Sequence, residues 1–198
     1  MHHIIKAIYM EENISPQQSL QIIQSMISKV KDNISENRFY FLLWGWLTFL
    51  AILIQFMLKV VFHYQHHYLV WLVTIPAVLI TVLRSRKRER TMPRTYVSES
   101  MSYLWKGIGI SFFILCLIIS STKEGWLNGY PFYVLFYGLG TFVSGKILQF
   151  RPLIIGGIIN WLLACVAVLV YFDYQMLVAA AAILTSYIIP GHLLKSKN

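Results

Sequence analysis

Charged residues, and acidic residues in particular, are scarce in this chain. Only 13% of its 198 residues are charged, about half of the ~25% that is usual in soluble domains. Hydrophobic residues make up 57%, more than the ~45–50% of an ordinary globular protein. This balance excludes a disordered chain and argues against a soluble enzyme. It is typical of an integral membrane protein.

Several features that would carry chemistry are also missing. The two cysteines, Cys116 and Cys165, lie inside apolar runs and form neither a CxxC motif nor a metal-ligand pattern. The sequence contains no HExxH, GxSxG or Walker A motif, and no acidic residue is embedded in an apolar run. We therefore predict that the protein is not an enzyme and that it uses no cofactor.

Six apolar runs have lengths suited to crossing a bilayer, which takes ~20 residues as a helix. Helices close their own backbone hydrogen bonds in lipid, and no strand-like alternation is present, so an all-α fold is expected. The predicted membrane domain covers residues 39–194, followed by a short tail at 195–198. Its spans are residues 39–62, 68–83, 104–120, 130–150, 153–172 and 176–194.

Basic residues orient these spans. The chain has 17 Lys and Arg against 8 Asp and Glu. If the N-terminus is cytoplasmic, every basic residue except Lys59 and Lys123 falls on the inside, as the positive-inside rule requires. The densest run, at 84–90, follows an apolar run and has no interleaved aromatic residues. This pattern predicts cytoplasmic termini and contact with anionic lipid, and it argues against nucleic-acid binding.

An amphipathic helix is expected before the first span, at residues 15–36. Ser15 and Pro16 suit a helix start. Residues 1–9 have no signal-peptide pattern, and residues 1–14 are expected to be a flexible extension. The helix could lie on the membrane, pack on its own chain or bind a partner. It lacks Trp, Phe and a basic face, which favours packing or partner binding. Its apolar stripe consists of Leu20, Ile23, Ile27, Val30 and Ile34.

Polar residues of the spans suggest two candidate sites. The region between the fourth and fifth spans is rich in glycine and basic residues, which fits either tight helix packing or a small cationic pocket open to phosphate or lipid headgroups. The candidate pocket residues are Gln55, Ser144, Lys146, Arg151 and Asn160. His63, His66 and His67 could bind a transition metal weakly, but no carboxylate or cysteine joins them. A polar interfacial loop is the favoured interpretation of these histidines.

Two further patterns concern symmetry. Gly45–Phe49 in the first span and Gly138–Phe142 in the fourth each follow an aromatic-rich start. A 3+3 inverted repeat, as in many transporters, would produce such an echo, although the other spans do not match. The small residues Ala179–Ala182 would permit a homodimer without requiring one.

Four segments together resemble a family of small, uncharacterised inner-membrane proteins of Bacteroidota-type bacteria. The resemblance extends from about Ile14 to the C-terminus. It implies a bacterial inner-membrane location and a multi-pass architecture, but no activity and no functional residue. The segments are ISPQQSL at 14–20, LLWGW at 42–46, SGKILQFRPLI at 144–154 and IPGHLL at 189–194.

These observations favour a non-catalytic membrane protein. We expect an accessory, scaffold or regulatory subunit that binds another membrane or cytoplasmic protein through the helix at 15–36. The alternative is a small-solute transporter, which would need a polar cavity near Gln55 and Asn160.

Overall fold

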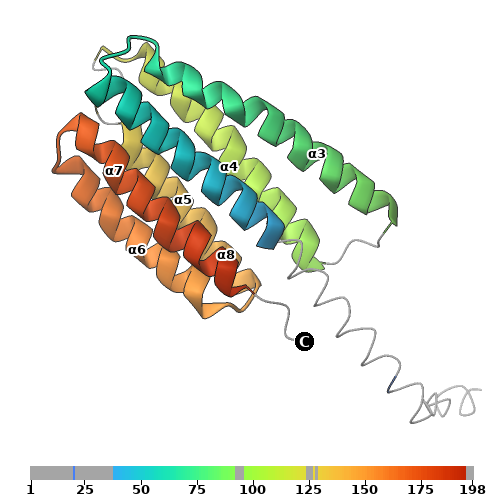
Figure 1. The fold of residues 1–198 in the computed structure, drawn as a ribbon. Helices are drawn as coiled ribbons and strands as arrows, with labels where there is room; N and C mark the ends of the chain where they lie inside the picture. Colours follow the sequence, from blue (N-terminus) through green and yellow to red (C-terminus); the bar gives the residue numbers. More distant parts are fainter. Residues whose placement is uncertain (1–19, 21–37, 92–95, 124–126, 128, 195–198) are drawn as a thin grey trace, which may run out of the picture.

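The computed structural model describes residue 20 and residues 38–91, 96–123, 127 and 129–194. In these ranges the chain forms six long helices that run side by side in alternating directions (Figure 1). The all-α architecture predicted from the sequence is therefore confirmed. Of the amphipathic helix expected at 15–36, only Leu20 is described, and its side chain is exposed. That prediction otherwise lies outside the described residues, as do the extension at 1–14 and the tail at 195–198.

The helices differ modestly in extent from the predicted spans. The first, Arg38–Val61, ends in the π-helical turn η1 (Met57–Val61). A 3-10 segment, η2 (His67–Val73), leads into α3 (Thr74–Thr91). The sixth helix is continuous through α7, a second π-helical turn and a short α-helix. The remaining bounds are α4 (Tyr96–Ser121), α5 (Gly129–Ile147), α6 (Arg151–Val168), α7 (Phe172–Ile183), η4 (Leu184–Ile188) and α8 (Ile189–Leu193).

Within the described ranges, five of these helices are long and apolar enough to cross a membrane. The exception is α5, which corresponds to the predicted fourth span. It has 19 residues, but its glycines, tyrosines and Lys146 keep its mean hydropathy below the level that the other five reach. It also lies deep in the bundle, where it packs most extensively against α6 and also contacts α4 and α7. A helix shielded by its neighbours can be less apolar than one that faces lipid.

Glycine lets α5 and α6 approach closely. A Cβ at Gly157 would lie 2.7 Å from the backbone nitrogen of Phe142, and one at Gly145 would lie 2.6 Å from that of Ile154. Neither contact is sterically acceptable, so both sites require glycine for this approach. The three-residue connection at 148–150 turns the chain back directly, with Gln149 at φ 51 and Pro152 in the first turn of α6. In lipid the hydrophobic effect does not hold helices together, so close packing at small residues stabilises their association instead.

α3 lies at the edge of the bundle (Figure 1). Only 6% of its apolar span is buried, against 56% of the span that contains α7. Trp44 Nε1 donates a hydrogen bond to Thr81 Oγ1 at 3.2 Å, and the Arg84 guanidinium lies 3.9 Å from the Phe39 ring centre. These two contacts connect α3 to the first helix. The remaining surface of α3 exposes large apolar side chains, as expected of a helix surrounded by lipid.

The two ends of the bundle differ in charge. We call the end where α3 finishes and α6 begins the basic end. All described Lys and Arg residues except Lys59 and Lys123 lie in the half of the bundle nearer to it. The opposite end carries those two lysines, the histidine loop and Asp173. The fold thus brings together basic residues that are widely separated in sequence.

Candidate functional site

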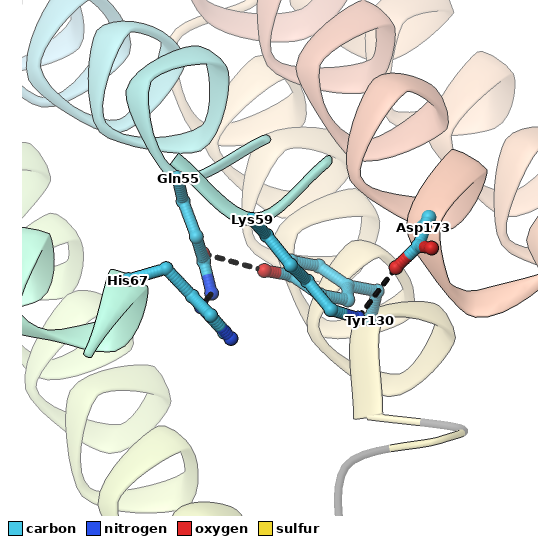
Figure 2. Close-up of polar contacts among 5 residues, drawn as sticks. All are labelled: Gln55, Lys59, His67, Tyr130 and Asp173. Carbon is cyan, nitrogen blue, oxygen red and sulfur yellow. Dashed lines mark hydrogen bonds and ion pairs between the residues drawn. The ribbon is translucent and has the colours of Figure 1, made fainter. Parts of the chain in front are cut away.

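The amide of Gln55 is a hydrogen-bonding hub near the opposite end of the bundle (Figure 2). Its Oε1 accepts hydrogen bonds from Trp71 Nε1 at 2.8 Å and from Tyr130 OH at 2.7 Å. Its Nε2 lies 3.3 Å from His67 Nδ1. An amide nitrogen can only donate, so this contact requires a His67 tautomer with an unprotonated Nδ1. The hub joins the first helix to η2 and α5, and Gln55 is only 5% exposed.

An ion pair lies one helical turn further out. Lys59 Nζ, in the turn η1, is 2.5 Å from Asp173 Oδ1 in the first turn of α7 (Figure 2). The same ammonium lies 3.9 Å from the ring centre of Phe172, and that ring packs against Tyr130 with 5.7 Å between centres. The two charged side chains are 28% and 45% exposed. The pair therefore lies where the bundle meets water or lipid headgroups.

Together these groups form the Gln55 cluster, which consists of Gln55, Lys59, His67, Trp71, Tyr130, Phe172 and Asp173. It connects four segments of the chain, namely the first helix, η2, α5 and α7. Its polar side chains form hydrogen bonds with one another, and its carboxylate is paired with a lysine. This arrangement suits holding helix ends together at the membrane surface, and it includes no nucleophile paired with a base.

A second group of polar residues lies in the interior, between α5, α6 and η4. Asn160 Nδ2 donates a hydrogen bond to Ser186 Oγ at 3.1 Å, and Ser186 in turn donates to the carbonyl of Ala182 at 2.7 Å. Ser186 belongs to the π-helical turn η4, a departure from regular geometry that often occurs at functional sites. We call the fully buried polar residues of these three elements the polar centre: Thr141, Ser144, Asn160 and Ser186, none of which has any exposed surface.

Two atoms of the polar centre have no protein partner. They are the acceptor Asn160 Oδ1 and the hydroxyl Ser144 Oγ, both fully buried. A buried polar group without a partner destabilises a fold by about 1–3 kcal/mol. Thr141, by contrast, satisfies its hydroxyl within its own helix, donating to the Tyr137 carbonyl at 2.7 Å. The polar centre therefore has hydrogen-bonding capacity that the chain itself does not use.

The five candidate pocket residues fall in different places. Gln55 belongs to the Gln55 cluster, whereas Ser144 and Asn160 belong to the polar centre. The two groups contact α5 at Tyr130 and near Gly138, two turns or about 12 Å apart along the helix. Lys146 and Arg151 are exposed at the basic end, with Lys146 Nζ 5.7 Å from the Phe142 ring centre. No single pocket unites the five in the described structure.

The three histidines also have separate partners. His63 Nδ1 lies 3.2 Å from the carbonyl of Val61, His66 Nδ1 lies 3.1 Å from the hydroxyl of Tyr68, and His67 contacts Gln55. Across the described ranges, no group of three His, Cys, Asp or Glu side chains is placed to hold a metal ion. The alanines at 179, 180 and 182 are buried within the chain, so this small-residue stripe serves internal packing.

Sequence reasoning missed most of the Gln55 cluster. The sequence analysis assigned Trp71 and Tyr130 to no site, and nothing local links Lys59 to Asp173, which is 114 positions away. One signal was available. Lys59 interrupts an apolar run four residues after Gln55. This spacing places both residues on one helix face.

Comparison of the chain with protein-family models, curated proteins and solved structures found no match. The evidence for its class therefore comes from its own fold. Five long apolar helices within an all-α bundle define a multi-pass helical membrane protein.

Proposed function

We propose that this chain is a non-catalytic accessory, scaffold or regulatory subunit of a membrane complex. The observation that carries the proposal is the closed interior of the bundle. Glycine contacts seal α5 against α6, the Gln55 cluster joins the helix ends, and the polar centre is fully buried. Because these residues serve internal packing, we expect partner binding to use the outer surface of the bundle and the predicted helix at 15–36.

The partner-binding element in this proposal is the helix at 15–36. Its apolar stripe precedes Arg38, the first residue of the first helix, and that helix starts at the basic end. By the positive-inside rule the basic end faces the cytoplasm, which puts the segment 15–36 in the cytoplasm as well. We infer that the membrane is a bacterial inner membrane. This location rests on the family resemblance of the sequence.

Affinity purification of the tagged full chain from its own host, followed by native mass spectrometry, tests the proposal. The variant Ile23→Ser/Ile27→Ser/Val30→Ser should lose a stoichiometric partner while still inserting into the membrane. The matched control, Gln17→Ser/Gln21→Ser/Gln24→Ser, alters the opposite face and should keep it. Equal recovery with both variants, or no stoichiometric protein with the wild type, would contradict the proposal.

The second candidate function is transport of a small neutral solute. The polar centre supports it, because Asn160 Oδ1, beside the π-helical turn that contains Ser186, and Ser144 Oγ on α5 both have unused hydrogen-bonding capacity. Alternating access would expose this region to water during the cycle. Ser186→Cys, in a Cys116→Ala/Cys165→Ala background, should then react with a small water-soluble thiol reagent, whereas the buried control Ala164→Cys should not. Equal protection of both cysteines would reject transport through the polar centre.

A further inference from the structure

The basic end of α3 has an unusual distribution of charge. The helix continues for about two turns beyond Leu83, its last apolar residue. Successive residues of an α-helix are rotated by about 100°. The basic residues in these turns therefore point in several directions around the axis and do not share one face. We call them the α3 collar: Arg84, Arg86, Lys87, Arg88 and Arg90.

The part of α3 that precedes the collar is apolar and exposed. Leu79 and Leu83 are 57% and 64% exposed, and Ala77 is the one buried hydrophobic residue of α3 among those described. Four of the five collar side chains are exposed, and Arg88 is partly buried. Along α3, exposed apolar side chains are followed by basic ones. Acyl chains and phosphate groups follow one another in the same order across one leaflet of a bilayer.

Two contacts fix the position of the collar along the first helix. The hydrogen bond from Trp44 to Thr81 and the stacking of Arg84 on Phe39 attach the middle of α3, just before and at the start of the collar, to the start of the first helix. Tryptophan prefers the headgroup level of a bilayer, so Trp44 marks the boundary that the collar follows. Since the collar starts one helical turn beyond Thr81, the partner of Trp44, we expect it to reach the headgroup level.

Among the described residues at this end, basic side chains outnumber acidic ones. Further basic residues, such as Lys106 and Arg151, lie in the same half of the bundle, whereas Glu99 is the one acidic side chain described there. The collar sequence itself contains one acid, Glu89. Clusters of four to eight basic residues directly beyond a spanning helix attract anionic lipids, with a gain that accumulates for each residue.

We propose that the α3 collar binds the headgroups of anionic phospholipids of the adjacent leaflet. The distribution of charge around the axis favours several headgroups surrounding the helix over one ligand in a pocket. This inference does not depend on the accessory function proposed above. A nucleic acid or an acidic protein would be a different occupant, and the test separates these from lipid.

Native mass spectrometry of the purified full chain in mild detergent, titrated with phosphatidylglycerol or phosphatidylcholine, tests the proposal. The wild type should prefer phosphatidylglycerol, and the preference should shrink as salt is raised. Arg86→Gln/Lys87→Gln/Arg90→Gln should weaken phosphatidylglycerol binding by about tenfold or more, with little change for phosphatidylcholine. Because lipid is added to purified protein, any change in membrane orientation during expression does not affect the result.

The matched control is Lys106→Gln/Lys146→Gln/Arg151→Gln, which removes the same charge at the same end from helices other than α3. It should retain most of the preference. The variant Arg86→Lys/Arg90→Lys, which keeps the charge, should bind as the wild type does, because the interaction depends on charge and not on the guanidinium group. Equal binding of both lipids by the wild type, or equal losses in the collar and control variants, would overturn the proposal. So would a wild type that retains nucleic acid or an acidic protein and shows no lipid preference.

Discussion

Lys59 and Asp173 are 114 positions apart in the chain and form an ion pair with 2.5 Å between Nζ and Oδ1. The pair links the end of the first helix to the start of α7. It lies directly outside the hydrogen-bonding hub of Gln55, and the Phe172 ring packs against both the lysine ammonium and Tyr130. At the end opposite the basic end, a few side chains from separate helices therefore join segments that are far apart in the sequence.

Removing the ion pair should have a small effect on stability. Both side chains are partly exposed, so we expect a coupling free energy of about 0.2–1 kcal/mol between Lys59→Ala and Asp173→Ala. A double-mutant cycle of thermal unfolding in detergent measures it, with Lys123→Ala as the control for loss of a lysine at the same end. Coupling should fall as salt rises. Coupling well above this range that does not respond to salt would show that the pair is shielded from solvent.

Gln55→Leu should destabilise the protein by about 1–3 kcal/mol. The substitution leaves the Trp71 and Tyr130 donors without an acceptor in a buried position. Unfolding measured against Gln65→Leu, which makes the same change in the exposed histidine loop, separates this effect from added hydrophobicity. If Gln55→Leu is as stable as the control, the hub contributes nothing to stability.

Gly157→Ala should destabilise the α5–α6 packing. Its Cβ would meet the Phe142 backbone at 2.7 Å, so one helix must move. Gly109→Ala makes the same change on α4, where nothing lies within 4 Å. It should be neutral or stabilising by up to about 1 kcal/mol, because alanine favours the helix. The unfolding temperature should therefore fall for Gly157→Ala and stay the same or rise for Gly109→Ala, and equal changes in the two variants would rule out the close approach.

Opposite ends of the bundle should label from opposite sides of the membrane. In a background without Cys116 and Cys165, His63→Cys should react with a membrane-impermeant thiol reagent on intact cells. Arg86→Cys should react only after the cells are permeabilised, because the basic end is expected to face the cytoplasm. The reverse pattern would invert the proposed orientation, and labelling of both sites on intact cells would contradict a fixed one.

The sequence by itself determined the class of the protein. Apolar runs of spanning length permit only helices in lipid, since the backbone must satisfy its own hydrogen bonds there. The first helix and α6 accordingly start within two residues of the predicted positions. α3 and α4 extend further than predicted, because their polar and basic turns continue the helix beyond the apolar part.

Only the tertiary structure decided which polar residues act together. Gln55 and Asn160 look alike in sequence as amides within apolar runs, but helix packing directs one to Trp71 and Tyr130 and the other to Ser186. The partnership of Lys59 with Asp173 likewise has no local signal. Periodicity along one helix specifies which face is polar, whereas the identity of the facing helix depends on how all six helices pack.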